Sequence, residues 1–173
     1  MKPVIVLDTS AFIAGYEASS DGENYTTPSV MGELEESGLP HLRLEAAIET
    51  GRIKIMEPEE RYINQVRMIA AELGEIGKLS EADMDVLSLG LQFKDLGRKP
   101  LIISDDYSLQ NIADRIGLDY RGMTTQGIKH RIRWEIYCPG CREVFQNLRP
   151  NALCPICGTK LKRRPAEKES IRR

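Results

Sequence analysis

The sequence predicts an α/β domain with a central parallel sheet flanked by helices, followed by a small cysteine-rich module near the C-terminal end. Three observations support this prediction. Short apolar runs, typical of strands buried on both faces, alternate with helical patterns through the first 125 or so residues. All four cysteines fall in one C-terminal stretch, and the balance of charge changes sign between these two parts of the chain.

An apolar run over residues 3–8 predicts the first strand, which ends on an aspartate. A short helix over 9–14 and a polar loop over 19–24 follow. A helix over 27–38 begins with Thr-Pro, a favoured pair at a helix start, and a helix over 40–51 begins with proline and ends in glycine. This part of the chain therefore predicts one buried strand and three helices.

The same alternation continues along the chain. Residues 52–56 alternate like a strand, and residues 59–75 place five apolar side chains on one helical stripe. Ser-Glu-Ala-Asp at 80–83 resembles a capping box at the start of the next helix. A second apolar strand over 101–104 leads into an Asp-Asp pair and a helix that ends at Gly117. Such an order favours a parallel sheet with helices on both faces.

The four cysteines form two C-x-x-C pairs, Cys138-Pro-Gly-Cys141 and Cys154-Pro-Ile-Cys157. The twelve residues between the pairs are enough for a β-hairpin to bring four thiolates around one tetrahedral Zn²⁺. Two disulfide bonds are the alternative, but nothing else in the sequence indicates secretion. We therefore predict a zinc ribbon with β-hairpin knuckles and one structural Zn²⁺.

Charge divides the chain into an acidic and a basic part. Residues 1–127 hold 12 Lys and Arg against 22 Asp and Glu, a net charge of −10, whereas residues 128–173 hold 12 against 4, a net charge of +8. The basic part predicts a surface for a polyanion. Because the sequence has no run of 18 apolar residues and no apolar N-terminal leader, we expect a cytoplasmic protein without a membrane partner.

Carboxylates stand where the predicted strands end. Asp8 ends the first strand, and Asp105 and Asp106 follow the second apolar strand. Because the carboxyl ends of neighbouring parallel strands meet at one edge, these charges are expected to lie together, which favours a divalent cation such as Mg²⁺ or Mn²⁺. Glu33 lies on the inward face of its predicted helix, and Asp83 lies at a helix start. The alternative for each is a helix cap or a solvated charge.

Four segments contain these acids: Asp8-Thr-Ser-Ala-Phe-Ile, Pro28-Ser-Val-Met-Gly-Glu33-Leu, Leu79-Ser-Glu-Ala-Asp83-Met-Asp-Val-Leu and Ile103-Ser-Asp-Asp106-Tyr-Ser-Leu-Gln-Asn111. Together they resemble the acidic motifs of PIN-domain ribonucleases. With the four cysteines added, the chain resembles the archaeal Nob (Nin-one-binding) endonucleases of ribosome maturation. The resemblance covers about residues 4–160 and lacks the long insertion of the eukaryotic members.

This resemblance implies a set of catalytic residues, Asp8, Glu33, Asp83 and Asp106, with Ser104 and Asp105 as further candidates. It implies that Asp8, Asp83 and Asp106 bind Mn²⁺ or Mg²⁺, and it leaves open which of Asp105 and Asp106 faces the metal. The implied activity is endonucleolytic maturation of the 3′ end of small-subunit (16S) rRNA. The implied partners are precursor rRNA and the small ribosomal subunit, with a KH-domain assembly factor as a further candidate.

Basic and aromatic side chains after residue 127 are candidates for RNA binding. Three cations alternate along residues 128–134, and further cations follow in and after the cysteine hairpin. An aromatic ring can also stack on an unpaired base. The predicted RNA-binding residues are Lys129, Arg131, Arg133, Trp134, Arg142, Arg149, Lys160 and Lys162.

These patterns divide the chain into a PIN-like nuclease domain over 1–125, a basic linker over 126–133, a Cys₄ zinc ribbon over 134–164 and a disordered basic tail over 165–173. Two other functions stay open. A toxin-type PIN ribonuclease would share the acids but normally lacks a ribbon, and a non-catalytic RNA-binding adaptor would need the ribbon alone. The sequence contains neither a phosphate-binding loop nor a credible Ser/His/Asp triad.

Overall fold

The structure is a computed structural model that describes residues 2–18, 21–34, 38–146 and 148–171. The elements follow in the order β1 (Val4–Leu7), α1 (Thr9–Ile13), β2 (Glu23–Thr26), α2 (Pro28–Glu33), α3 (Leu39–Glu49), β3 (Ile53–Ile55), α4 (Glu60–Glu72), α5 (Glu81–Asp95), β4 (Pro100–Ile103), α6 (Tyr107–Arg115), β5 (Asp119–Arg121), β6 (His130–Tyr137), β7 (Val144–Phe145) and β8 (Lys162–Ser170). We call the part that holds β1 to β5 and α1 to α6 the N-terminal body.

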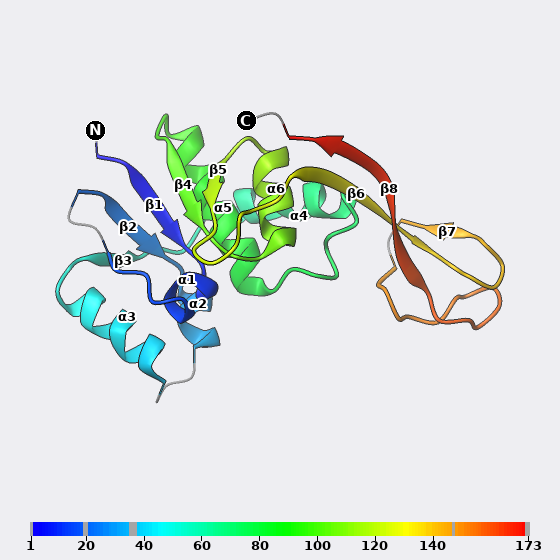
Figure 1. Ribbon diagram of the computed structural model, residues 1–173, viewed down its shortest axis with the longest axis horizontal. Coiled ribbons are helices and arrows are strands. Elements are labelled where there is room, and N and C mark those ends of the chain that lie inside the picture. Colours follow the sequence, from blue (N-terminus) through cyan, green and yellow to red (C-terminus); the bar gives the residue numbers. More distant parts are fainter. Residues whose placement is uncertain (1, 19–20, 35–37, 147, 172–173) are drawn as a thin grey trace.

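The N-terminal body contains a five-stranded sheet in the order β3-β2-β1-β4-β5, in which every neighbouring pair is parallel. The central strands β1 and β4 are largely buried, and α5 packs against both. Helices surround the sheet, as the alternating pattern predicts (Figure 1). The predicted α/β class with a parallel central sheet is therefore confirmed.

Two strands of this sheet lie where the apolar pattern predicts none. Part of the predicted polar loop belongs to β2, whose Asn24 and Thr26 are buried. Their polar groups are bonded within the fold, since Thr26 Oγ1 donates to Leu7 O at 2.9 Å and Asn24 Nδ2 donates to Arg52 O at 3.2 Å. Strand β5 has only three residues. Buried polar side chains and short edge strands carry no apolar periodicity that a sequence pattern can detect.

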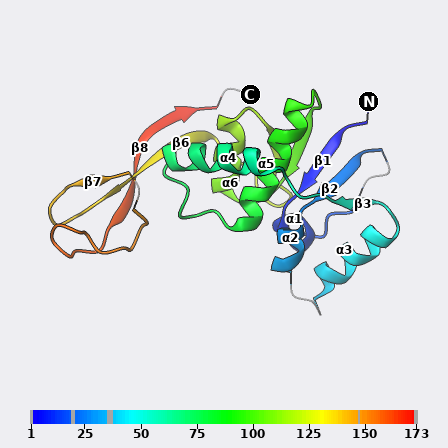
Figure 2. The same ribbon diagram turned by 180° about the vertical axis from the view of Figure 1, so that it is seen from behind.

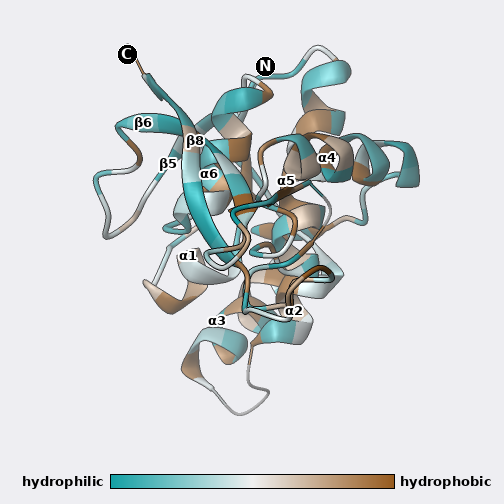
Figure 3. Cartoon of the chain, turned by 90° about the vertical axis from the view of Figure 1, so that its right-hand side faces the viewer, coloured by the Kyte–Doolittle hydropathy of each residue, from teal (hydrophilic) through white to brown (hydrophobic). Residues whose placement is uncertain are grey.

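A second sheet of three antiparallel strands, in the order β7-β6-β8, extends from the N-terminal body (Figures 1 and 2). The long strands β6 and β8 form an arm that leads to the cysteines. Seen end-on, this arm carries mostly hydrophilic residues (Figure 3). Within the described ranges, no helix has the length and apolar content needed to cross a membrane.

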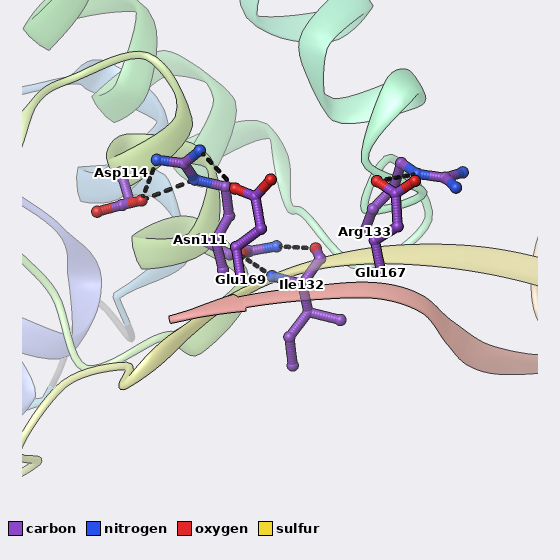
Figure 4. Close-up of polar contacts among 7 residues, drawn as sticks. Asn111, Asp114, Ile132, Arg133, Glu167 and Glu169 are labelled. Carbon is purple, nitrogen blue, oxygen red and sulfur yellow. Dashed lines mark hydrogen bonds and ion pairs between the residues drawn. The ribbon is translucent and has the colours of Figure 1, made fainter. Parts of the chain in front are cut away.

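The arm differs from the predicted linker and tail. Residues predicted as a linker over 126–133 enter β6, and the tail predicted to be disordered from residue 165 forms most of β8. Cross-strand ion pairs join β6 to β8; in one of them Arg133 Nε lies 3.1 Å from Glu167 Oε2 (Figure 4). A two-stranded arm is stabilised by cross-strand pairs and needs few apolar residues, so composition alone does not indicate it.

The arm is also bonded to the N-terminal body through α6 and the end of α4. Asn111 of α6 bonds to both backbone groups of Ile132 in β6 (Figure 4). Trp134 N donates to Leu73 O at 2.8 Å, next to Gly74, where an added Cβ would lie 2.3 Å from Trp134 O. Gly74 is thus required both by its φ of +68° and by the close approach of β6.

Candidate active site

Asp8 lies at the carboxyl end of β1 and is only 4% exposed. Its Oδ2 accepts hydrogen bonds from Ser104 Oγ at 2.7 Å and from Ser10 Oγ at 2.8 Å. Ser104 follows β4, the parallel neighbour of β1, so the two strand ends meet as the topology requires. Burial raises the pKa of Asp8, and the hydrogen-bond donors only partly oppose this rise. A nearby positive charge would therefore favour its ionised form.

Asp83 lies in the first turn of α5, where it completes the predicted capping box. Ser80 N donates to Asp83 Oδ2 at 2.8 Å, and Asp83 N donates to Ser80 Oγ at 3.1 Å. Burial raises the pKa of Asp83 to about 6, and the negative charges of Asp8 and Asp106 act in the same direction. Asp83 therefore caps α5 and also interacts with the charges of Asp8 and Asp106. We call Asp8, Asp83 and Asp106 the acidic cluster.

Asp105 and Asp106 are adjacent in sequence, but their carboxylates have different surroundings. Asp106 is the N-cap of α6, where its Oδ1 accepts from Leu109 N at 2.7 Å, and its charge acts on Asp83. The Asp105 carboxylate instead accepts hydrogen bonds from backbone and hydroxyl groups of residues 123–125. Burial acts to raise the pKa of Asp105, but these bonds outweigh it and lower the pKa to about 2. Asp105 thus anchors a loop, whereas Asp106 belongs to the acidic cluster.

Glu33 is the last residue of α2 and is exposed, which differs from the predicted inward-facing side chain. Its Oε2 accepts a hydrogen bond from Thr9 Oγ1 at 2.6 Å, so it lies next to the residue that follows Asp8. Thr9 and Ser10, which bond to Glu33 and Asp8, were not predicted as site residues. The sequence feature that could have indicated them is the pair of hydroxyl residues directly after Asp8.

The four cysteines come together at the far end of the arm. Their sulfur atoms all lie within 4.8 Å of one another, with Cys138 and Cys157 at 3.3 Å and Cys141 and Cys154 at 3.6 Å. Tetrahedral Zn–S bonds of about 2.3 Å would separate the sulfurs by about 3.8 Å, whereas a disulfide requires about 2.05 Å. All four are free cysteines, which removes the disulfide alternative and leaves a group that can hold a metal ion.

Among the residues that the structure describes, the cysteines are the one group of three or more His, Cys, Asp or Glu ligands close enough to hold a metal ion directly. The carboxylates of Asp8, Asp83 and Asp106 are set more widely. Mg²⁺ and similar hard cations keep several waters and need only one or two protein carboxylates, so these acids need not all contact one ion directly. The donor set thus suits a hydrated divalent cation at the strand ends.

The predicted RNA-binding residues fall into two groups. Arg131 and Arg133 already form ion pairs, the first with Asp114 at 2.7 Å and the second with Glu167 in β8. Trp134 is half-buried, with the Arg163 guanidinium carbon 3.8 Å from its ring centroid. The remaining predicted cations are exposed; these are Lys129, Arg142, Arg149, Lys160 and Lys162.

Comparison with known proteins agrees with this geometry. Residues 5–93 match the family described as PIN domain of ribonuclease. A protein of Pyrococcus abyssi named Endoribonuclease Nob1 is 38% identical over 98% of this chain and 99% of its own length. One of the same name from Methanocaldococcus jannaschii is 34% identical over 93% of this chain and 77% of its length, and Ribonuclease VapC1 of Thermoplasma acidophilum is 32% identical over 97% and 81%.

The parallel sheet, the acids at its carboxyl edge and the matched family together define the class, a PIN-domain ribonuclease. The chain belongs, within that class, to the family of the Nob1 endoribonucleases, with which it aligns through both the N-terminal body and the cysteine arm. It is an endoribonuclease, and the interpretation as a non-catalytic adaptor is set aside.

Proposed function

We propose that this endoribonuclease matures the 3′ end of small-subunit (16S) rRNA in the cytoplasm, with Mg²⁺ or Mn²⁺ bound at the acidic cluster. The observation that supports this most is the shared electrostatic environment of Asp8, Asp83 and Asp106 at the carboxyl edge of the sheet. Relatives that align with nearly the whole chain are named Endoribonuclease Nob1. Their name supports the endoribonuclease activity, and the resemblance of the acidic motifs and cysteines to the Nob endonucleases of ribosome maturation supports the role in rRNA processing.

Asp8, Asp83 and Asp106 would hold the cation, and Glu33 would act from the rim of the site. When bound, a divalent cation lowers the pKa of a water and stabilises negative charge on the reacting phosphate. Ser104 Oγ orients Asp8 by donating to it at 2.7 Å and accepts from Asp106 N at 3.1 Å. Ser104 is therefore a positioning residue that connects two of the proposed ligands.

Zn²⁺ is the proposed ion of the four cysteines, and its role is structural because all four ligand positions come from protein. Hydrogen bonding with the side chain and the backbone of Thr159 lowers the pKa of the Cys157 thiol to about 6, which favours the thiolate that Zn²⁺ requires. The exposed cations around the cysteines would bind the phosphates of precursor rRNA. The small ribosomal subunit and a KH-domain assembly factor are the proposed macromolecular partners.

The test is cleavage of an RNA that spans the 3′ end of the small-subunit rRNA, with Mg²⁺ or Mn²⁺ present or omitted. Asp8→Asn should lose at least roughly 100-fold in single-turnover rate, equivalent to about 3 kcal/mol of transition-state stabilisation. The matched control is Asp95→Asn. Asp95 is the last residue of α5, far from Asp83 in the first turn, so this variant should cut at the wild-type rate. Equal rates for Asp8→Asn and wild type, or a cut away from the mature 3′ end, would overturn the proposal.

A further inference from the structure

A pocket of about 520 Å³ lies beside the acidic cluster, between the N-terminal body and the arm. Asp106 and Ser108 of the α6 start form one side, and Lys78 comes from the loop between α4 and α5. Trp134 of β6, Pro150 and Arg163 of β8 complete the lining. The pocket therefore needs both the arm and the N-terminal body, and neither Lys78 nor Ser108 was predicted as a site residue.

Arg163 is held rigidly in this wall. Its guanidinium lies on the ring of Trp134, 3.8 Å from the ring centroid, and Nη1 is 3.1 Å from Glu75 Oε2. Glu75 is 1% exposed and also accepts from Asn111 Nδ2 at 3.0 Å. A stacked, ion-paired guanidinium has lost its rotamer freedom before any ligand binds, so it offers a preorganised surface.

Two cations, Lys78 and Arg163, line this pocket together with Asp106 of the acidic cluster. Lys78 is exposed, and Arg163 lies close enough to Asp106 for their charges to interact. Glu75 already balances much of the Arg163 charge, so Lys78 is the cation expected to attract an anion most strongly. Next to a cluster of carboxylates, a polyanionic chain needs such a cation to hold its neighbouring phosphate.

We propose that this pocket binds one nucleotide of single-stranded RNA, adjacent to the scissile phosphodiester, with Lys78 on its phosphate and the Arg163–Trp134 stack against its base. Flat π surfaces and guanidinium planes are the usual platforms for unpaired bases. The proposal rests on the proposed function, because Asp106 marks the reacting end of the pocket. Its consequence is that both the N-terminal body and the arm position the RNA at the cut.

The first test measures affinity, without cleavage, for a single-stranded RNA that spans the mature 3′ end. Both proteins carry Asp8→Asn so that the RNA is not cut. The Lys78→Ala variant of this parent should bind the RNA about tenfold more weakly than the parent does. Its slope of log affinity against log salt should fall by about 0.7. The matched control is Lys99→Ala, an exposed lysine at the amino end of β4, which should leave both quantities unchanged. Equal affinity and slope for Lys78→Ala and its parent would overturn the proposal.

The second test locates the bound phosphate. RNAs with one neutral methylphosphonate linkage, placed in turn on each side of the cut, should bind the parent protein more weakly at one position next to the cut. At that position Lys78→Ala should show no further loss, because the partner of the lysine is already neutral. Additive losses at every position would place Lys78 away from the RNA. Cleavage at the mature 3′ end by the wild-type protein tests the proposed function separately, because that measurement does not involve a change at Lys78.

Trp134 provides a direct signal, since it is the only tryptophan in the chain. Saturating RNA should change its fluorescence, and the change should follow the same binding curve as anisotropy of labelled RNA. Arg163→Lys keeps a cation for Glu75 but removes the planar stack, so it should weaken binding while the melting temperature is maintained. RNA that binds by anisotropy without altering Trp134 emission would show that the pocket is not the nucleotide site.

Discussion

The side chain of Asn111 in α6 hydrogen-bonds both backbone groups of Ile132 in β6, accepting from Ile132 N at 2.8 Å and donating to Ile132 O at 2.7 Å. An amide side chain thereby pairs with β6 in place of a neighbouring strand. The same Nδ2 donates to Glu75, so one residue joins α6, the end of α4 and the arm. Together with the bond from Trp134 N to Leu73 O, this contact joins the N-terminal body to the arm.

Replacing Asn111 by alanine should destabilise the protein strongly. The substitution removes three hydrogen bonds and leaves the buried Glu75 and the Ile132 backbone with fewer partners. We expect a loss of about 2–4 kcal/mol in the free energy of unfolding, measured in urea. Asn64→Ala on the exposed face of α4 is the control and should change it by less than about 0.5 kcal/mol. Similar values for the two variants would contradict the connecting role of Asn111.

The two neighbouring aspartates should respond differently to the same substitution. Asp106→Asn removes a charge from the acidic cluster and should reduce cleavage by roughly 100-fold or more. Asp105→Asn affects a carboxylate that bonds to residues 123–125, so it should retain metal-dependent cleavage within about threefold. Single-turnover rates on the same RNA provide the measurement. A greater loss for Asp105→Asn than for Asp106→Asn would reverse their assignment.

Stability should depend on pH through Asp105. Its pKa of about 2 in the folded state is below the usual 3.8, so the folded state favours its ionised form. The stabilisation is present above pH 4 and is lost as the pH falls towards 2. After allowance for solvent screening we expect about 1 kcal/mol. In urea unfolding, the difference between wild type and Asp105→Asn should therefore shrink between pH 4 and pH 2, and a constant difference would contradict this role.

Removal of one thiolate should unfold the cysteine module while the parallel sheet persists. Metal analysis should find one Zn²⁺ per chain in the wild type and far less in Cys154→Ser, because a closed four-ligand site contributes its binding energy to folding. Leu153→Ser is the control, since Leu153 is 65% exposed on the same loop and should leave the zinc content unchanged. Wild-type protein with no zinc after purification without chelator would refute the zinc assignment.

The two cysteine knuckles differ at one backbone position. Arg142 has a φ of +66° directly after Cys141, where the second knuckle has Gly158 with a φ of +71°. A non-glycine residue is strained there, so Arg142→Gly should stabilise the metal-bound module by about 0.5–1 kcal/mol. Gly158→Ala should destabilise it by a similar amount. Thermal unfolding with zinc bound measures both, and lower stability for Arg142→Gly would show that its side chain contributes more than the strain costs.

Several features of this protein were determined by short sequence patterns. The two C-x-x-C knuckles and the capping box at Ser80 and Asp83 could be predicted from the sequence, because each depends on residues only three positions apart. An apolar run followed by an aspartate placed Asp8 at a strand end, because a parallel sheet brings such ends to one edge. The sequence alone therefore predicted the α/β class, the cysteine cluster and the acids that meet.

Other features depend on partners far apart in the chain, and only the tertiary structure decided them. Glu167 meets Arg133 across 34 residues, which turns a polar tail into a strand. The direction of each carboxylate separates Asp105 from Asp106, although their positions in sequence are almost equivalent. Burial and side-chain direction depend on the assembled fold, so they could not be predicted from local sequence pattern or composition.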